Sequence, residues 1–564
     1  MAAISFHQND ILSKLLPELI NLICEELRPK DLVNLRCVNH NLHSLVTPWA
    51  FRHIKLRAVW RNNNAHQGFI KIARSENLRS WVREVDVDTW AGPRLTYRSD
   101  RCPWPADFMN ALPLLRCFRN TSTLNVRFDQ DCGYADDSGV DETPDFRYRI
   151  LDIIFQCLAG TWTCTRQKRV DETLDSNGYI PNYEVSEAPA NVETDSLMSL
   201  RGLTVRNLAH YVDRRLTDSE AFNTVMDSGT LVDLKLQFAE QSSMTFNRGL
   251  PDGIGEHDVF ADLHKTWLRP AVASNLRVLS LYYFHDWGWC PKMDFRFINP
   301  AEGGFPNLRV LALGTYVFSH EWQIDWIASQ GKRNPYGGLQ ELYLDDCSVL
   351  YHAKYKAPLE QGTSVVGRDS GGNDIVVSNE GYPLRHNVPT NMAQLCTVEH
   401  HSSIHWSDIL SRWRTTMTSL KVFKMGYGAW EEPDDETGDA EIDSDLHHQA
   451  VFPMPRSLHH NNPFRDFAYT PSPPQSWHLL EGVERYMGWR GMSEDREFVL
   501  VYVRFAFNSR PSGYTWLREH DTKKPGDALK PYKEGDERAL DIFRETVEAR
   551  RIGKTSLLAY LVSL

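Results

Sequence analysis

Cysteine is scarce in this chain of 564 residues, which has ten copies and no pair separated by two residues. Disulfide frameworks and zinc fingers need cysteines at close and regular spacings. The scattered positions therefore predict buried thiols in a reducing compartment.

Long apolar runs are also lacking. No stretch of about 18 apolar residues occurs, so we expect no transmembrane helix. The first residues, Met1 to Asp10, have neither the charged nor the apolar region of a signal peptide. We predict a cytoplasmic or nuclear protein that does not associate with membranes.

Basic charge is not concentrated anywhere in the sequence. The formal net charge is -12, and nine acidic residues lie between Glu431 and Asp445, so the rest of the chain carries only -3. Proteins that bind nucleic acids through the phosphate backbone usually carry a basic stripe or patch. We therefore expect no nucleic-acid partner.

Motifs for catalysis are missing as well. Gly553-Lys554-Thr555 is similar to the end of a phosphate-binding loop, but Glu548 stands where that loop needs a glycine. No serine, cysteine or paired carboxylate lies in a recognisable catalytic motif. We predict no catalytic residue, no cofactor and no enzymatic activity, with an enzyme built from groups distant in the sequence as the alternative.

A metal site has weak support. Cys396, His400, His401 and His405 lie close together in the sequence, but no second pair with zinc-like spacing accompanies them. We interpret them as surface residues of a loop and predict no bound metal.

Near the N-terminus the chain contains three short amphipathic segments. In the first, Pro17 lies at the expected helix start, where a missing N-H is tolerated. Apolar residues then recur at intervals of three and four, which puts them on one helical face. They are Leu16, Leu19, Ile20, Ile23 and Leu27.

The second and third segments continue this pattern. Pro29 ends the first helix and opens a second. The apolar positions are Leu32, Leu35 and Val38 in the second helix, and Leu42, Leu45, Val46 and Trp49 in the third. About forty residues cannot bury so much apolar surface among themselves. Either a partner covers the surplus, or the helices form a hairpin that packs on the rest of the chain.

Residues 14–56 resemble an F-box of the fungal type. The resemblance lies in Leu16-Pro17-Glu18, Asp31-Leu32, Leu35-Arg36-x-Val38 and Trp49-x-Phe51, although the family's opening has one residue between its proline and glutamate. It implies that the helices bind a Skp adaptor and, through it, a cullin-based ubiquitin ligase. The residues it assigns to adaptor binding are Leu16, Pro17, Leu19, Ile20, Ile23, Leu27, Leu32, Leu35, Val38 and Trp49.

Beyond residue 60 one short sequence pattern recurs, which we call the phrase. In it, a leucine is followed at the third and fifth positions by apolar residues. The final alternation has the period of a strand with one buried face, and a helical pattern usually precedes it. The clearest copies are Leu276 to Leu281, Leu308 to Leu313 and Leu339 to Leu344, and weaker ones are Leu200 to Val205, Leu231 to Leu236, Leu420 to Met425, Trp81 to Val87 and Thr121 to Val126.

Repeated helix-strand units predict parallel strands that share one core. The pattern is similar to a degenerate leucine-rich repeat, so the predicted fold class is α/β, with a three-helix F-box followed by an irregular leucine-rich-repeat-like solenoid, or horseshoe. The spacing is uneven, and a three-layer α/β domain is the alternative. The second leucine of the phrase falls at Leu203, Leu234, Leu279, Leu311 and Leu342.

The predicted domains follow from these patterns. The F-box covers residues 14–56, and the solenoid covers 60–430 with polar insertions at 166–195 and 354–394, where we expect loops or disorder. An acidic, proline-rich disordered insert covers 431–475. Residues 476–564 form the last repeat and a cap, with a helix from Trp477 to Met487, a buried strand from Phe498 to Phe505 and a solvated helix from Glu534 to Arg551.

The sequence also suggests where a target protein binds. Aromatic residues follow the best repeat strand, and tyrosine and tryptophan are frequent in binding hot spots. Filling the core between repeats is the alternative role of these rings. The target-binding candidates are Ser280, Tyr282, Tyr283, Trp287, Tyr343 and Lys424, and other positions expected on the concave face include Thr204 and Lys235. The leading hypothesis is a substrate-recognition subunit of a Skp-cullin-F-box ligase, and a scaffold acting outside a ligase is the alternative.

Overall fold

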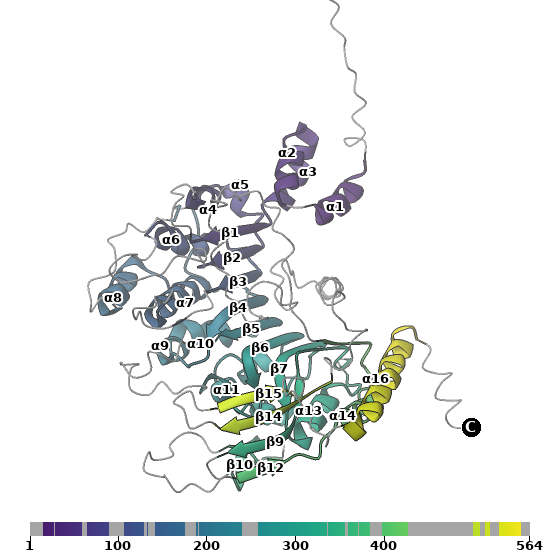
Figure 1. Cartoon of the computed structure of the whole chain (residues 1–564). Coiled ribbons are helices and arrows are strands. Elements are labelled where there is room, and N and C mark those ends of the chain that lie inside the picture. Colours follow the sequence, from purple (N-terminus) through teal and green to yellow (C-terminus); the bar gives the residue numbers. More distant parts are fainter. Residues whose placement is uncertain are drawn as a thin grey trace, which may run out of the picture. The chain divides into compact units, whose positions relative to one another are not determined.

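The computed structural model describes residues 15–27, 29–58, 65–89, 106–128, 132, 142–174, 188–189, 191–239, 258–335, 337–355, 359–369, 371–383, 398–426, 500–507, 514–518 and 530–553 (Figure 1). The chain divides into two compact units. Unit 1 comprises Met1–Arg127 and Asp145–Leu200, and unit 2 comprises Phe128–Pro144 and Arg201–Leu564. In these described ranges, no helix combines the length and the apolar character needed to span a bilayer.

Unit 1 begins with the helices α1 (Pro17–Glu26), α2 (Pro29–Arg36) and α3 (His40–Ala50). Proline occupies the first turn of α1, where its fixed φ suits a helix and its missing N-H is not needed. Asn39 caps α3, because its side-chain oxygen accepts a hydrogen bond from the backbone N-H of Leu42 at 2.8 Å.

A parallel sheet follows in unit 1, formed in order by β1 (His53–Arg57), β2 (Glu84–Asp88) and β3 (Thr123–Arg127). The weak copies of the phrase at residues 81–87 and 121–126 thus end in β2 and β3. Two rows of buried apolar side chains cross the strands, namely Ile54, Val85 and Leu124, and Leu56, Val87 and Val126.

Helices connect these strands, and Figure 1 shows α4, α6 and α7 beside them. Phe69 of α4, Phe108 of α6 and Ile154 of α7 are buried. Parallel strands need a crossover connection, which is usually helical. The helical elements are α4 (Ala65–Arg74), α5 (Glu76–Arg79), α6 (Ala106–Ala111), the 3-10 helix η2 (Leu112–Cys117), α7 (Pro144–Ala159) and α8 (Cys164–Leu174).

Helix α8 differs from the loop or disorder expected for residues 166–195. It joins α7 through charge: Arg166 forms two hydrogen bonds to the carboxylate of Asp152, at 2.6 and 2.8 Å, and Arg149 pairs with Asp171. Asp152 and Arg149 are buried. Ion pairs and hydrogen bonds, and not an apolar stripe, therefore connect this polar helix to α7.

Unit 2 contains a parallel series of strands in the order β4-β5-β6-β7-β8-β13, most of them visible side by side in Figure 1. Their bounds are Gly202–Ala209 for β4, Asp233–Ala239 for β5, Val278–Trp287 for β6, Val310–Phe318 for β7, Glu341–Asp345 for β8 and Val422–Gly426 for β13. The predicted parallel sheet is therefore confirmed.

The register of these strands aligns the repeated phrase. Each second leucine pairs with the second leucine of the next strand, in the row Leu203, Leu234, Leu279, Leu311, Leu342 and, at the end, Phe423. A second row contains Val205, Leu236, Leu281, Leu313, Leu344 and Met425. A one-residue slip in any strand would move its apolar side chains to the other face, so these rows fix the register.

The sheet continues past β7 through strands far apart in the sequence. The end of β7 pairs with β9 (Ser348–Tyr355), which pairs in parallel with β14 (Val501–Phe507). The antiparallel strands β12 (Val398–His401) and β15 (Tyr514–Arg518) pair with β9 and β14, respectively. The predicted strand from Phe498 to Phe505 thus corresponds to β14, although its first two residues lie outside the described part.

Helices of unit 2 flank the strands. Helix α14 buries Trp406, Ile409, Leu410 and Trp413, which recur at helical spacing, and Met417 directly after the helix is buried too. The helical elements are α9 (Arg214–Thr217), α10 (Glu220–Met226), α11 (Asp258–Asp262), α12 (Pro270–Ala273), η4 (Phe295–Phe297), η5 (Pro300–Glu302), α13 (Glu321–Gln330), α14 (Trp406–Thr416) and α16 (Lys530–Arg551).

Helix α16 is not solvated on all sides, contrary to the expectation for residues 534–551. Leu540, Phe543 and Val547 are buried, at spacings of three and four that put them on one face. Asp536 is buried too, and its carboxylate accepts hydrogen bonds from the Tyr502 hydroxyl and from the backbone N-H of Ser407. Although charged residues dominate the sequence of this helix, it has a narrow apolar stripe, and the helix contacts α14 and β13.

The second polar insertion, residues 354–394, also contains regular structure. Strands β10 (Thr363–Arg368) and β11 (Asp374–Ser378) form an antiparallel hairpin. Its turn is held by Asp369, whose Oδ1 accepts hydrogen bonds from the N-H groups of Gly371 and Asn373 at 2.8 and 2.9 Å. Turn chemistry of this kind favours a hairpin even where few side chains are apolar. The expected insert at 431–475 and the expected helix from Trp477 to Met487 lie outside the described residues.

Candidate functional site

The helices α1, α2 and α3 share a small core. Its buried members are Ile20, Cys24, Leu32, Leu42 and Val46, and partly buried side chains around it include Leu15, Leu27, Leu35, Leu45 and Trp49. The α1 members are three or four residues apart, so this core takes up one side of α1 only.

Polar contacts hold the three helices in place. The indole N-H of Trp49 in α3 donates a hydrogen bond to Oδ1 of Asn21 in α1 at 3.0 Å. The Arg36 guanidinium at the end of α2 donates to the hydroxyl of Thr47 in α3 at 2.9 Å and lies over the ring of Phe51, 5.0 Å from its centroid. These contacts fix α1 and α2 against α3.

A second set of apolar side chains in this region is exposed to solvent. Leu16 is 65% exposed, Leu22 59% and Val38 59%. Two more, Leu19 and Ile23, lie on α1 next to the residues that face the helical core. We call the whole set the N-terminal apolar face: Leu16, Leu19, Leu22, Ile23, Val33 and Val38. Leu16, Leu19 and Ile23 recur at intervals of three and four, which puts them on one side of α1 and its N-cap. Contiguous exposed apolar side chains mark interaction surfaces, whereas isolated ones are common on any protein.

The residues expected to bind an adaptor thus divide into three groups. The exposed ones are Leu16, Pro17, Leu19, Ile23 and Val38. Leu27, Leu35 and Trp49 are partly buried against the helical core. Ile20 and Leu32 are only 3% and 6% exposed, so their side chains belong to that core and support the surface from below.

Sequence reasoning missed two members of the N-terminal apolar face, Leu22 and Val33. Leu22 is three residues after Leu19, and Val33 directly follows Leu32, so both are neighbours of residues that the resemblance assigned to adaptor binding. The available signal was the width of the apolar arc on α1, since Leu22 and Ile23 are adjacent and a helix with a single buried face seldom needs both.

A charged cluster lies on the strands of unit 1. The Nε2 atom of His53 is 2.8 Å from Oδ2 of Asp86, and the amide of Asn125 donates to Oε1 of Glu84 at 2.7 Å and to Oδ1 of Asp86 at 2.9 Å. Burial disfavours the charged form of His53, but the contact with Asp86 and the charges of Asp86 and Glu84 raise its pKa to about 9. The carboxylates are already paired, so this cluster is an internal ion network and not an open site.

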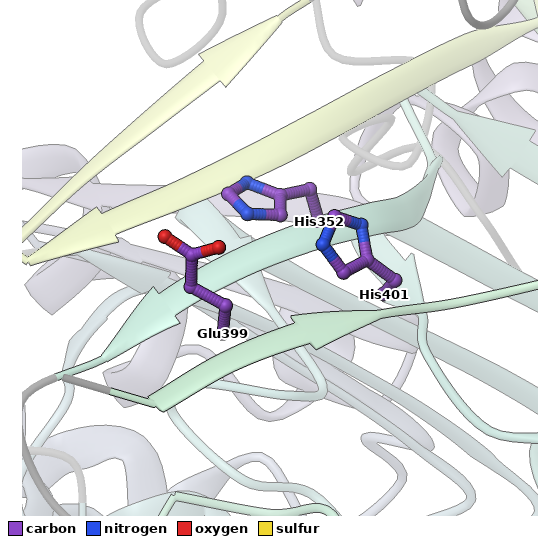
Figure 2. A group of neighbouring side chains, drawn as sticks. All are labelled: His352, Glu399 and His401. Atoms are coloured by element: carbon purple, nitrogen blue, oxygen red, sulfur yellow. The ribbon is translucent and has the colours of Figure 1, made fainter.

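Another polar cluster lies on β9 and β12 of unit 2. Figure 2 shows that His352, Glu399 and His401 point toward one another. One ligand atom of each lies within 4.8 Å of those of the other two. Burial and the neighbouring His401 lower the pKa of His352 from its usual value, with smaller effects from other charges.

The four residues that suggested a metal in the sequence have separate locations. His401 lies in this cluster, whereas His400 is its neighbour on β12 and is half-buried. His405 caps α14, where its backbone N-H donates to the carboxylate of Asp408. Cys396 lies outside the described residues. The sequence analysis did not single out His352, which comes from another strand, β9, or Glu399, which lies two residues before His401 on β12.

Most of the candidates for target binding are inaccessible. Tyr282, Tyr283 and Trp287 are fully buried, and Phe260 packs against Tyr283 and Trp287 with 5.1 Å between ring centroids. Ser280, Tyr343, Thr204 and Lys235 are buried as well, and Lys424 is half-buried. The aromatic cluster therefore fills the core of unit 2 in this structure, which was the alternative role considered for it.

Comparison with known proteins concerns the N-terminal helices. No curated protein matches the chain. Residues 12–52, which include α1, α2 and α3, match the family model of the F-box domain. The N-terminal apolar face therefore belongs to an F-box domain.

Proposed function

We propose that this chain is a substrate-recognition subunit of a Skp-cullin-F-box ubiquitin ligase. F-box domains generally bind Skp adaptors, and the adaptor would link this chain to a cullin. The observation that carries the proposal is the N-terminal apolar face, which stays exposed although the same helices already have a core of their own.

Burial of this face would drive adaptor binding. Fully burying one leucine side chain is worth about 1.5 to 3 kcal/mol relative to leaving it exposed. Ordering costs reduce the gain, so a few central residues are expected to dominate. Leu19, Leu22 and Ile23 on α1 are the best candidates for this centre.

The remainder of the chain would present a target protein. We propose that its helix-strand units form a leucine-rich-repeat-like solenoid, a proposal supported by the aligned leucine rows of β4 to β8. The ligase chemistry would belong to other subunits, with this chain serving as a non-enzymatic receptor. Small-angle scattering tests the solenoid, because a compact three-layer domain gives a shorter maximum dimension than a horseshoe of equal mass.

The test of function is capture of a purified Skp adaptor by the full chain. Leu19→Asp and Leu22→Asp should abolish capture, because each puts a charge on the surface to be buried. Val376→Ser is the matched control, since Val376 is also an exposed apolar residue (54%) but lies in the β10-β11 hairpin.

Wild-type affinity in both α1 variants, or no capture by the wild-type chain, would contradict the proposal. The second result would favour a scaffold that acts outside a ligase.

A further inference from the structure

Two histidines and a glutamate converge on neighbouring strands of unit 2 (Figure 2). Strand β12 is antiparallel to β9, and His401 is directly opposite His352. Glu399 is two residues before His401, so both project from the same face of β12. Backbone pairing alone therefore brings the three side chains together.

The donor set consists of two imidazole nitrogens and one carboxylate oxygen. Two histidines and one glutamate form one of the three-ligand sets that hold zinc while leaving a fourth position open. Ligand atoms about 2.1 Å from one zinc ion lie ~3.4 Å apart in a tetrahedron. The observed atoms are within 4.8 Å of one another, so small side-chain rotations bring them to that geometry.

These side chains are accessible and can rotate. Glu399 and His401 are exposed, and His352 is half-buried. The two imidazole rings lie 4.7 Å apart between centroids, tilted by 44° and not stacked. Among the residues that the structure describes, Glu399 pairs with Lys354 at the surface, with 3.6 Å between its carboxylate and Lys354 Nζ. Such contacts are weak enough for a metal to displace.

The comparable group in unit 1 differs, because its side chains already contact one another and a neighbouring amide. In the cluster of His53, Glu84 and Asp86, the side chain of Asn125 donates to both carboxylates, and His53 contacts Asp86. A metal there would have to displace these buried contacts. The cluster on β9 and β12 carries no comparable cost.

We propose that His352, Glu399 and His401 form a zinc-binding site with a fourth position open to water. Magnesium and calcium are poor candidates, because they prefer oxygen ligands and two of the three donors are nitrogens. The ion would join β12, a strand of only four residues, to β9. Zinc would therefore stabilise this part of unit 2.

The test is a zinc titration of the full chain after treatment with a chelator, in competition with a coloured zinc indicator. Wild-type protein should bind one more equivalent of zinc than the variants His352→Ala, Glu399→Gln and His401→Ala. Each variant should weaken that site by more than about tenfold, the least that removal of a metal ligand's outer partner typically costs. His400→Ala is the control, because His400 lies on the same strand but on its opposite face.

Thermal unfolding provides a second readout. Zinc should raise the melting temperature of the wild type and of His400→Ala, but not that of His401→Ala, and magnesium should not change it. The variants must match the wild type in circular dichroism without metal. The proposal is overturned if His352→Ala and His401→Ala bind as much zinc as the wild type, if His400→Ala loses an equal amount, or if the wild type does not compete with the indicator.

Discussion

Trp49 in α3 holds Asn21 in α1 through a single hydrogen bond, with 3.0 Å between the indole Nε1 and Oδ1. The two residues are 28 positions apart, and the bond lies at the solvent edge of the helical core. It connects α3 to the helix that carries Leu19, Leu22 and Ile23 of the N-terminal apolar face.

Removing this bond should loosen α1. Asn21→Ala is expected to cost roughly 0.5 kcal/mol, at the low end for a hydrogen bond because water can replace the lost partner. Faster amide hydrogen exchange in residues 17–26 of the full chain, with unchanged exchange in β4 to β7, is the expected measurement. Unchanged exchange in α1 would mean that the core alone positions this helix.

Two neighbouring residues of α1 should respond differently to substitution. Ile20→Ala removes a side chain from the core and should lower stability by about 2 to 5 kcal/mol. Leu19→Ala removes an exposed side chain and should change stability by no more than about 0.5 kcal/mol. Chemical denaturation of the full chain, followed by tryptophan fluorescence, measures both.

Adaptor affinity separates the two residues further. Leu19→Ala should weaken adaptor binding by about 1 to 3 kcal/mol while the helices remain folded. A Leu19→Ala variant with normal binding would move the adaptor contact elsewhere on the F-box.

The pH dependence of stability should carry a contribution from His53. Its pKa in the folded chain is about 9, above the usual value of 6.5, so protonation stabilises the fold. The contribution is fully present below about pH 6.5 and is lost as the pH rises to about 9. His53→Gln should remove this part of the pH dependence, which denaturation midpoints at pH 6 and pH 9.5 would reveal. An identical loss of stability in wild type and variant over this range would contradict the assignment.

Glu341 on β8 should also make stability fall as the pH rises, but over a lower pH range than His53 does. Burial raises its pKa to about 8, and the hydrogen bond from the Tyr343 hydroxyl at 2.8 Å counteracts this only in part. The protonated form is therefore the stable one in the fold, and stability falls as the pH rises from about 4.5 to about 8.

Substitution with the neutral isostere tests this interpretation. Glu341→Gln keeps an oxygen that can accept from Tyr343 and should raise the melting temperature at pH 8, with little effect at pH 4.5. A lower melting temperature at pH 8 would show that the ionised carboxylate is stabilising.

Much of the parallel sheet could be predicted from local sequence. The pattern from Leu276 to Leu281, for example, predicts both a strand and its register. Leu279 and Leu281 alternate with a polar residue, so both side chains face the same core. The face of α14 was equally predictable, since its tryptophans recur at helical spacing. Both signals depend on residues that are close together in the chain.

Other features depend on partners that no local pattern identifies. His352 and His401 meet because β12 pairs with β9 in one particular register, and nothing in either segment specifies the other. The apolar arc of α1 predicted a helix, but not which part of the arc, Ile20 or Leu19, faces the helical core. Helix α8 was missed because ion pairs with α7, such as Arg166 with Asp152, replace an apolar stripe.

The leucine rows of unit 2 have a consequence for how such a chain can change length. Successive second leucines are 31, 45, 32 and 31 residues apart, yet they occupy one register position across β4 to β8. The register of each strand therefore depends on its own leucines and not on the length of the segment that connects it to the previous strand. The spacings differ by up to 14 residues without any shift in strand register, so each connection between strands is an independent place for new surface to arise.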